Sequence, residues 1–499
     1  MSLCSPRLAG PAGARRVAVA LAAGLLLPAT GLLLLAAAAT AQPVPERGLR
    51  LQTVPPLPDS LRLYGETFAT GLEPAPLLAP AQPVSLADAV AIALARNPER
   101  AASALEALRA ETDVTPGNAG FLPTLDASVR VSGGQGGQLF GGQRASAQGS
   151  TTVSADLAAG VTLFDGGRRA ATFARLEADA RRFALLADLD AEALVLAVVT
   201  AYYDAARQAA LVDALAEAVG VSEDRLRLAA AEVRIGTAAD VDAALALADL
   251  NADRAALLRQ QLQLAAARAT LGGLLALPDP LAVAPADSLA LGPPPDLPRL
   301  ALLARTQNRR LRALAVAEEA AARVADEVRS EFAPRVRATA GLGAGAADRG
   351  PLPLAFRPGL AADLSYGLTL SLPLLDGGER RRRVQVAGIR QRQAALDTAG
   401  ERLALETELA RLAASVQTFR ALVALEARNE TIARQNVRVG LAQLQLGFIS
   451  PLELRQVQLA LVNVQTRRVD VLFQALRAEA ELRFLAGTLL PPEAVLAAP

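Results

Sequence analysis

The sequence predicts an α+β membrane protein made of two tandem copies of one unit. In each copy a helix, two strands, a long helix and a further helix follow one another. Three observations carry this prediction. The same landmarks recur at one constant spacing, four segments alternate like strands long enough to cross a bilayer, and two segments of about 69 residues contain no Pro or turn cluster.

The repeat is seen in short motifs that share a single offset. Phe121-Leu122-Pro123 corresponds to Phe332-Ala333-Pro334, and Asp165-Gly166-Gly167 corresponds to Asp376-Gly377-Gly378. Ile235-Gly236 corresponds to Leu446-Gly447, and Asn97 falls opposite Asn308. Because no gap separates these landmarks, the chain is two copies of one unit of about 190 residues.

The composition excludes several classes of function. The 499 residues include no His, one Cys and no Trp, and all 51 basic residues are Arg. A zinc site, a Ser-His-Asp or Cys-His pair and a disulfide framework are therefore excluded, and no cofactor is expected. The formal net charge of +1 lacks the basic excess of a nucleic-acid binder. Acid–base chemistry by Asp and Glu stays open, so an enzyme is disfavoured rather than excluded, and we expect no enzyme.

The segment 1–41 has the three parts of a secretory signal peptide. Arg7, Arg15 and Arg16 precede an apolar run, which ends at Ala39-Thr40-Ala41, a small-residue cleavage site. A membrane anchor is the alternative, but Pro28 within the run favours cleavage. The chain is therefore expected to be exported.

The remaining boundaries follow from Pro-rich stretches and from the repeat. We expect a signal peptide, an N-terminal linker, repeat 1, an inter-repeat linker, repeat 2 and a C-terminal tail. Their ranges are 1–41, 42–84, 85–275, 276–296, 297–487 and 488–499.

In each copy an opening helix precedes two strands. The opening helices are expected at 85–113, with Ser85 as N-cap, and at about 297–331. Apolar and polar residues then alternate with period two, which is typical of a half-buried strand. The predicted strands are 124–133, 151–164, 335–346 and 360–375. A soluble hairpin is the plain alternative, but strands of this length match those that cross a bilayer.

The long helices are predicted at 167–235 and 378–446. At 1.5 Å per residue each extends on the order of 100 Å, which is too long for a globular core. The second contains Leu405, Leu409, Leu412 and Val416 at alternating spacings of 4 and 3, the seam of a coiled coil. The helices therefore belong to a coiled-coil or tubular assembly.

The four strands of one chain cannot close a membrane barrel alone, because bacterial barrels use eight or more. Two, three or four copies would give 8, 12 or 16 strands, and physical reasoning leaves these open. Asp-Gly-Gly between strand and long helix is interpreted as a corner, formed by Asp165, Gly166, Gly167, Asp376, Gly377 and Gly378. The Arg clusters that follow, at 168–169 and 380–383, either meet phosphates of outer-membrane lipid or form a solvated charge run.

Over residues 85–487 the chain resembles the TolC-like outer-membrane efflux proteins. The resemblance rests on the doubled unit, on the strand ends leading into Asp-Gly-Gly, and on the helix turns at 234–240 and 446–451. It implies a homotrimer with a 12-stranded β-barrel that continues into a periplasmic α-helical barrel. The implied location is the outer membrane of a Gram-negative bacterium. The implied function is a passive export conduit in tripartite efflux or type I secretion, working with a periplasmic adaptor and an inner-membrane pump.

The resemblance and the strand pattern nominate three sets of site residues. The helical turns would meet the adaptor through Arg234, Gly236, Thr237, Gly447, Phe448 and Ser450. Acids just after the turns, Asp240, Asp242 and Glu453, would form a ring at the tunnel mouth; a plain first-turn acid is the alternative. Arg130, Asp156, Arg337 and Asp363 lie on polar strand faces and are expected to point into the barrel lumen.

A second hypothesis belongs to another class of protein. The same helices and short hairpins would also suit a periplasmic coiled-coil scaffold without a pore. Outer-membrane fractionation as an oligomer separates the two, because a scaffold would be recovered in the soluble fraction.

Overall fold

The computed structural model describes residues 82–136, 148–237, 239–348 and 361–490, all within the unit Pro74–Pro499. The expected signal peptide, most of the N-terminal linker and the end of the tail lie outside these residues. Within them, no helix combines the length and apolar character needed to cross a membrane.

The helices repeat with the offset found in the sequence. In the first copy they are α2 (Leu86–Arg96), α3 (Pro98–Thr112), α4 (Arg168–Arg234) and α5 (Asp240–Leu274). In the second they are α6 (Leu297–Gln307), α7 (Arg309–Arg329), α8 (Glu379–Gln445) and α9 (Pro451–Leu485). Both ends of α4 and α5 correspond to the ends of α8 and α9 at that single offset, so the tandem repeat is confirmed.

Each opening helix is broken, which corrects the continuous helices expected at 85–113 and 297–331. Asn97 separates α2 from α3, and Asn308 separates α6 from α7. The residue before a proline avoids the helical region, and Asn97 precedes Pro98. Each Asn side chain instead accepts N–H groups of the next helix, so the break is also an N-cap.

Four strands form one antiparallel sheet in the order β2-β3-β5-β6. They are β2 (Thr124–Gly136), β3 (Gln148–Phe164), β5 (Arg335–Asp348) and β6 (Ala361–Ser371). Each repeat supplies one hairpin, and β3 pairs with β5 to join them. The last strand is shorter than the expected 360–375, because Pro373 has no N–H to donate to a ladder.

Two short strands lie in the stretches expected to be linkers. β1 (Gln82–Val84) pairs in parallel with β4 (Val283–Pro285), so each Pro-rich stretch contains an ordered strand. A 3₁₀ turn over Ser330–Phe332 leads from α7 into β5.

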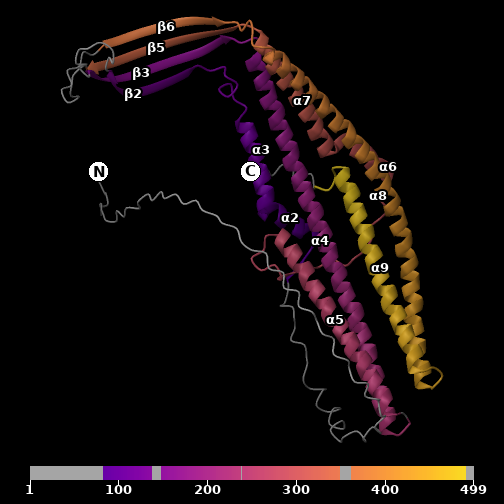
Figure 1. Cartoon of the computed structure of the whole chain (residues 1–499). Coiled ribbons are helices and arrows are strands. Elements are labelled where there is room, and N and C mark those ends of the chain that lie inside the picture. Colours follow the sequence, from indigo (N-terminus) through magenta and orange to yellow (C-terminus); the bar gives the residue numbers. More distant parts are fainter. Residues whose placement is uncertain (1–81, 137–147, 238, 349–360, 491–499) are drawn as a thin grey trace, which may run out of the picture. The chain divides into compact units, whose positions relative to one another are not determined.

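The four long helices form a row. α4 packs along α5 and along α9, and α9 packs also along α8, as Figure 1 shows. Each repeat has a core where its opening helices meet its long hairpin, and the two cores use corresponding residues. Ala93, Leu271 and Leu275 in the first match Ala304, Leu482 and Ala486 in the second. The predicted seam residues Leu405, Leu409, Leu412 and Val416 are buried in the second core.

Candidate functional site: sheet faces, corners and helical tips

The strand register places the four expected lumen residues on one face of the sheet. Asp156 on β3 lies across from Gly343 on β5, which lies across from Asp363 on β6. Arg130 on β2 and Arg337 on β5 lie an even number of residues from this row, so they share its face. This face also carries Ser and Thr side chains and is polar along all four strands.

The opposite face is apolar and uncovered in a single chain. Val129 is 75% exposed and Tyr366 is 86% exposed. The other exposed apolar residues of this face are Leu125, Val131, Leu157, Leu342, Leu364, Leu368 and Leu370. A continuous apolar surface of this extent marks contact with a membrane or another protein, because water disfavours it.

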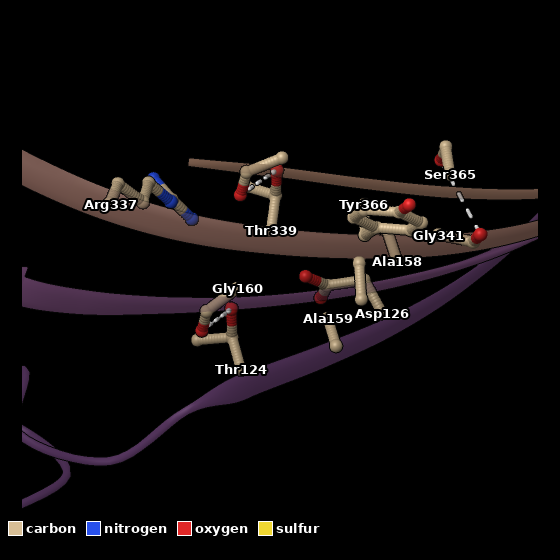
Figure 2. Close-up of a pocket in the computed structure, with 12 residues that line it drawn as sticks. Thr124, Asp126, Ala158, Ala159, Gly160, Arg337, Thr339, Gly341, Ser365 and Tyr366 are labelled. Carbon is tan, nitrogen blue, oxygen red and sulfur yellow. Dashed lines mark hydrogen bonds between the residues drawn. The ribbon is translucent and has the colours of Figure 1, made fainter. Parts of the chain in front are cut away.

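Two glycines on the polar face have no side chain, and the charged side chains of their neighbours occupy the space that a Cβ would take. A Cβ at Gly160 would lie 2.8 Å from Nη2 of Arg337, so the guanidinium lies over the bare glycine. At Gly343 a Cβ would meet carboxylate oxygens of Asp363 at 2.9 Å and Asp156 at 3.2 Å. Figure 2 shows the shallow pocket that Arg337 shares with Thr124, Asp126 and Thr339.

Asp-Gly-Gly lies between strand and long helix in both repeats. Gly166 and Gly167 have φ of 70° and 89°, and Gly377 and Gly378 have φ of 65° and 86°. Other residues rarely adopt this left-handed region, so the glycines permit the corner. A Cβ on Gly166 would also lie 2.2 Å from Cβ of Ala333, so this corner packs closely on the start of the second repeat's strands.

In each corner an arginine donates hydrogen bonds to the Asp of Asp-Gly-Gly and so stabilises the turn. The sequence analysis did not predict this structural role. Nε of Arg169 donates to Asp165 at 3.0 Å, and its other nitrogens donate to the carbonyls of Thr162 and Leu163. Its guanidinium lies 5.1 Å from the centre of the Phe121 ring. Phe121 and Arg169 recur as Phe332 and Arg380 at the offset of the repeat, and this recurrence could have indicated the paired role.

The second corner repeats the arrangement. Nε of Arg380 donates to Asp376 at 2.6 Å, and its guanidinium lies 5.2 Å from the Phe332 ring centre. The hydrogen bond from Arg380 lowers the pKa of Asp376 below its ordinary value. Within the two Arg clusters, Arg169 and Arg380 therefore stabilise the corners. Arg382 forms an ion pair with Glu379, and Arg383 forms one with Glu331.

The expected tip residues form the same turn twice. Gly236 and Gly447 have φ of 80° and 75°. The next backbone N–H groups, of Thr237 and Phe448, donate to the backbone carbonyls of Glu232 and Gln443. This is the Schellman ending of a helix. Ile235 and Phe448 are 73% and 75% exposed, and Arg234 is exposed. Each long hairpin therefore ends in a tight turn that presents apolar side chains.

The expected entrance acids lie in the first turns of α5 and α9. Glu453 accepts the backbone N–H of Ser450 at 2.7 Å, which lowers its pKa, and Ser450 caps the helix in return. Asp242 accepts the N–H of Ala239 at 3.2 Å, and Asp240 is the first residue of α5. Within one chain Asp242 and Glu453 thus act as helix caps, as acids in a first turn commonly do.

An ion pair near the tips joins the two repeats. Arg455 on α9 donates to both carboxylate oxygens of Asp253 on α5, at 2.6 and 2.8 Å. Ser222 on α4 also donates to Asp253. The partners come from different repeats and do not correspond under the offset that relates them, so no sequence pattern indicated them.

A sheet with one apolar and one polar face, continuous through rigid corners with helices on the order of 100 Å long, defines a class of outer-membrane channel proteins. The chain belongs to the outer membrane efflux protein family, whose model matches residues 89–277 and 300–488. These two matches cover the two repeats. The TolC-like resemblance and the outer-membrane location are confirmed.

Solved structures share this fold at low sequence identity. The CmeC outer membrane channel of Campylobacter jejuni is 16% identical with a TM-score of 0.68, over 81% of this chain and 85% of that one. VceC of Vibrio cholerae is 18% identical with a TM-score of 0.67, over 81% and 96%. The open state of the MtrE channel of Neisseria gonorrhoeae is 19% identical with a TM-score of 0.66, over 84% and 96%. A comparison with curated proteins gave no significant match.

Proposed function

We propose that three copies of this outer-membrane efflux channel protein close a 12-stranded barrel and a periplasmic helical tunnel. Substrates would pass through it from the periplasm or an inner-membrane pump to the exterior. The observation that carries this proposal is the sheet register, with every expected lumen residue on one face and exposed apolar residues on the other.

The sheet edges support closure by several copies. In the described part of the sheet, β2 and β6 each pair with one strand only. An unpaired edge leaves N–H and C=O groups without partners, which lipid does not tolerate. Pairing β2 of one copy with β6 of the next satisfies both edges. The number three comes from the family, since the edges alone also allow two or four.

Reconstitution into planar bilayers tests the conduit. The purified protein is expected to form stable conducting channels and to run from outer-membrane fractions as a heat-modifiable oligomer. Recovery as a soluble, non-conducting protein would instead support the scaffold hypothesis.

The helical turns are proposed to dock a periplasmic adaptor. Ile235 and Phe448 are exposed apolar residues at the ends of the hairpins, beside Gly236 and Gly447. Exposed aromatic and aliphatic side chains are typical anchors of protein interfaces. Arg234, Thr237 and Ser450 complete this tip surface.

Single alanine replacements at Phe448 and Ile235 test adaptor docking and leave Gly236 and Gly447, whose positive φ disfavours a side chain, unchanged. Phe448→Ala and Ile235→Ala should abolish export in cells that supply the cognate adaptor and pump, with trimer levels unchanged. Leu302→Ala removes a comparably exposed apolar side chain from α6 and serves as control. Export that survives the tip changes contradicts docking there.

We further propose that three copies of Asp240, Asp242 and Glu453 form an acidic ring at the tunnel mouth. Such rings favour cations. Glu453→Gln keeps the oxygen that caps Ser450 but removes the charge. A lower cation preference in bilayer recordings is expected, and an unaltered reversal potential contradicts the ring.

A further inference from the structure

The pocket on the polar face of the sheet contains one cation and one carboxylate that do not pair with each other. Arg337 on β5 and Asp126 on β2 both line this pocket, whose volume is about 340 Å³. Both residues are exposed, and neither side chain forms an ion pair or a hydrogen bond with another residue that the structure describes. Figure 2 shows the two side chains apart from each other in the pocket. Both charged groups are therefore available to a ligand.

Gly160 on β3 determines where the guanidinium lies. The Nη2, Nε and Cζ atoms of Arg337 lie 2.8, 3.3 and 3.5 Å from the position that a Cβ on Gly160 would take. The guanidinium therefore lies over the glycine, in space that any larger residue would fill. Thr124 lies directly across from Gly160, and Asp126 lies across from Ala158. Asp126 is thus the diagonal neighbour of the glycine that the guanidinium covers.

This register separates the two charges by more than the length of an ion pair. Diagonal neighbours across an antiparallel pair lie about 7–8 Å apart. A hydrogen bond between nitrogen and oxygen spans about 2.9 Å. A ligand with an anionic and a cationic group on neighbouring atoms can therefore contact Arg337 and Asp126 at once, whereas an ion with a single charge can contact only one of them.

The hydroxyl groups of the pocket add hydrogen-bond acceptors. Thr124, Thr339 and Ser365 each donate their hydroxyl proton to a strand carbonyl, at 3.4, 3.5 and 3.4 Å. Because the protons are used in this way, the oxygen lone pairs remain free to accept from a ligand. An ammonium group has three donors for such acceptors. The guanidinium of Arg337 offers a planar set of donors that matches a carboxylate.

We propose that this pocket binds compact zwitterions, with Arg337 binding a carboxylate and Asp126 binding a neighbouring ammonium group. Free α-amino acids have this chemistry. The inference rests on the proposed conduit, because the polar face would line its lumen, and it names a class of solute that the lumen binds in transit. Three copies would provide three such sites.

The arrangement favours selectivity over tight binding. An exposed ion pair contributes little free energy in water, so a ligand with one charge gains little from either residue. A zwitterion that has bound one residue brings its second charge to the other at a high effective concentration. The two contacts together therefore distinguish a zwitterion from an anion or a cation of the same size.

Three probes that share one side chain test this preference. Phenylalanine carries both charges, N-acetylphenylalanine carries only the anionic charge, and phenylalaninamide carries only the cationic charge. In planar-bilayer recordings of the purified native trimer, phenylalanine should reduce the current with a half-blocking concentration at least threefold lower than that of either analogue. This comparison needs no variant.

Replacing each charge assigns its role. Arg337→Gln should raise the half-blocking concentration of phenylalanine at least threefold, to that of phenylalaninamide. Asp126→Asn should raise it to that of N-acetylphenylalanine. Asp363→Asn is the matched control, because Asp363 is an exposed carboxylate on the same sheet face but does not line the pocket. It should leave the block by phenylalanine unchanged.

The amount of heat-modifiable trimer shows whether each variant assembles. Equal block of the native channel by the three probes, or an equal effect of Asp363→Asn and Asp126→Asn, overturns the zwitterion site and leaves the conduit intact. Native protein that forms no conducting channel overturns the proposed conduit itself.

Discussion

The side-chain amide of Asn97 donates to the carbonyl of Leu274 at 3.2 Å, joining the first break between helices to the end of the long hairpin. At the corresponding place in the second repeat, Asn308 donates to the carbonyl of Leu485 at 3.1 Å. Both Asn side chains also cap the helix that follows them. One polar group thus fixes the same junction in each repeat, where α5 or α9 returns to the opening helices.

Asn97→Ala should lower the free energy of unfolding by about 1–3 kcal/mol, because it removes a cap and leaves a carbonyl with one partner fewer. Denaturation of the purified protein in detergent measures this. Asn463→Ala, at an exposed position of α9, should change stability by less than about 0.5 kcal/mol. Equal stability of the two variants would contradict the junction role.

Tyr202→Phe should loosen the strand pair β1–β4. The Tyr202 hydroxyl lies 3.0 Å from the Val84 carbonyl, and it accepts the N–H of Asp287 at 3.0 Å. The ring is fully buried, and burial raises the pKa of Tyr202 to about 12. Losing the hydroxyl leaves that N–H without its partner, at a cost of about 1–3 kcal/mol.

Hydrogen exchange gives this prediction a local readout. Exchange at Asp287 should become faster in Tyr202→Phe. The same change at the neighbouring Tyr203, which is only partly buried, is the matched control and should leave that exchange rate unaltered. Identical rates in both variants would rule out a role for the hydroxyl.

Arg380→Ala should destabilise the second corner by about 2 kcal/mol, because it removes a charge-assisted hydrogen bond to Asp376 and the stacking on Phe332. Arg380→Lys should recover only part of this loss, since an ammonium lacks the planar fork. The yield and heat stability of oligomers in outer membranes report the effect. Arg381→Ala, at the next and exposed position, should match the native protein; an equal loss there would refute the specific role of Arg380.

Glu192 should make the folded state less stable as pH rises, which is opposite to the effect of a carboxylate whose pKa is lowered by an ion pair. It is 1% exposed and pairs with Arg309, yet burial outweighs that pairing and raises its pKa above the ordinary 4.5. The folded state then binds the proton more tightly than the unfolded state does. Its contribution to stability is therefore fully present below about pH 4.5 and is lost as pH rises through the raised pKa.

Melting temperatures measured across pH 4 to 8 check this sign. The native protein should lose stability with rising pH relative to Glu192→Gln, which has no proton to lose. Glu106→Gln, at an exposed pair on α3, controls for general pH effects. Parallel curves for the native protein and Glu192→Gln would show that the folded state does not raise this pKa.

Much of the architecture could be predicted from spacing alone. The alternation along 124–133 and 335–346 predicted which residues share a sheet face, because period two is a local property of the backbone. The left-handed glycines of both corners and both tips were also indicated, since a turn needs a residue without Cβ wherever φ is positive. Pro373 also indicated that β6 ends early, at Ser371, although the apolar alternation continues past it and predicted a longer strand.

The sequence by itself determined the doubled unit, the long helices, the two-faced strands and the family to which they belong, because each is a repeating pattern along the chain. Only the tertiary structure decided that Asn97 reaches Leu274, that Arg169 lies over Phe121 and that Arg455 pairs with Asp253. The two members of each of these pairs are far apart in the sequence. They meet because of how the helices pack and the corners bend, and neither periodicity nor composition records that geometry.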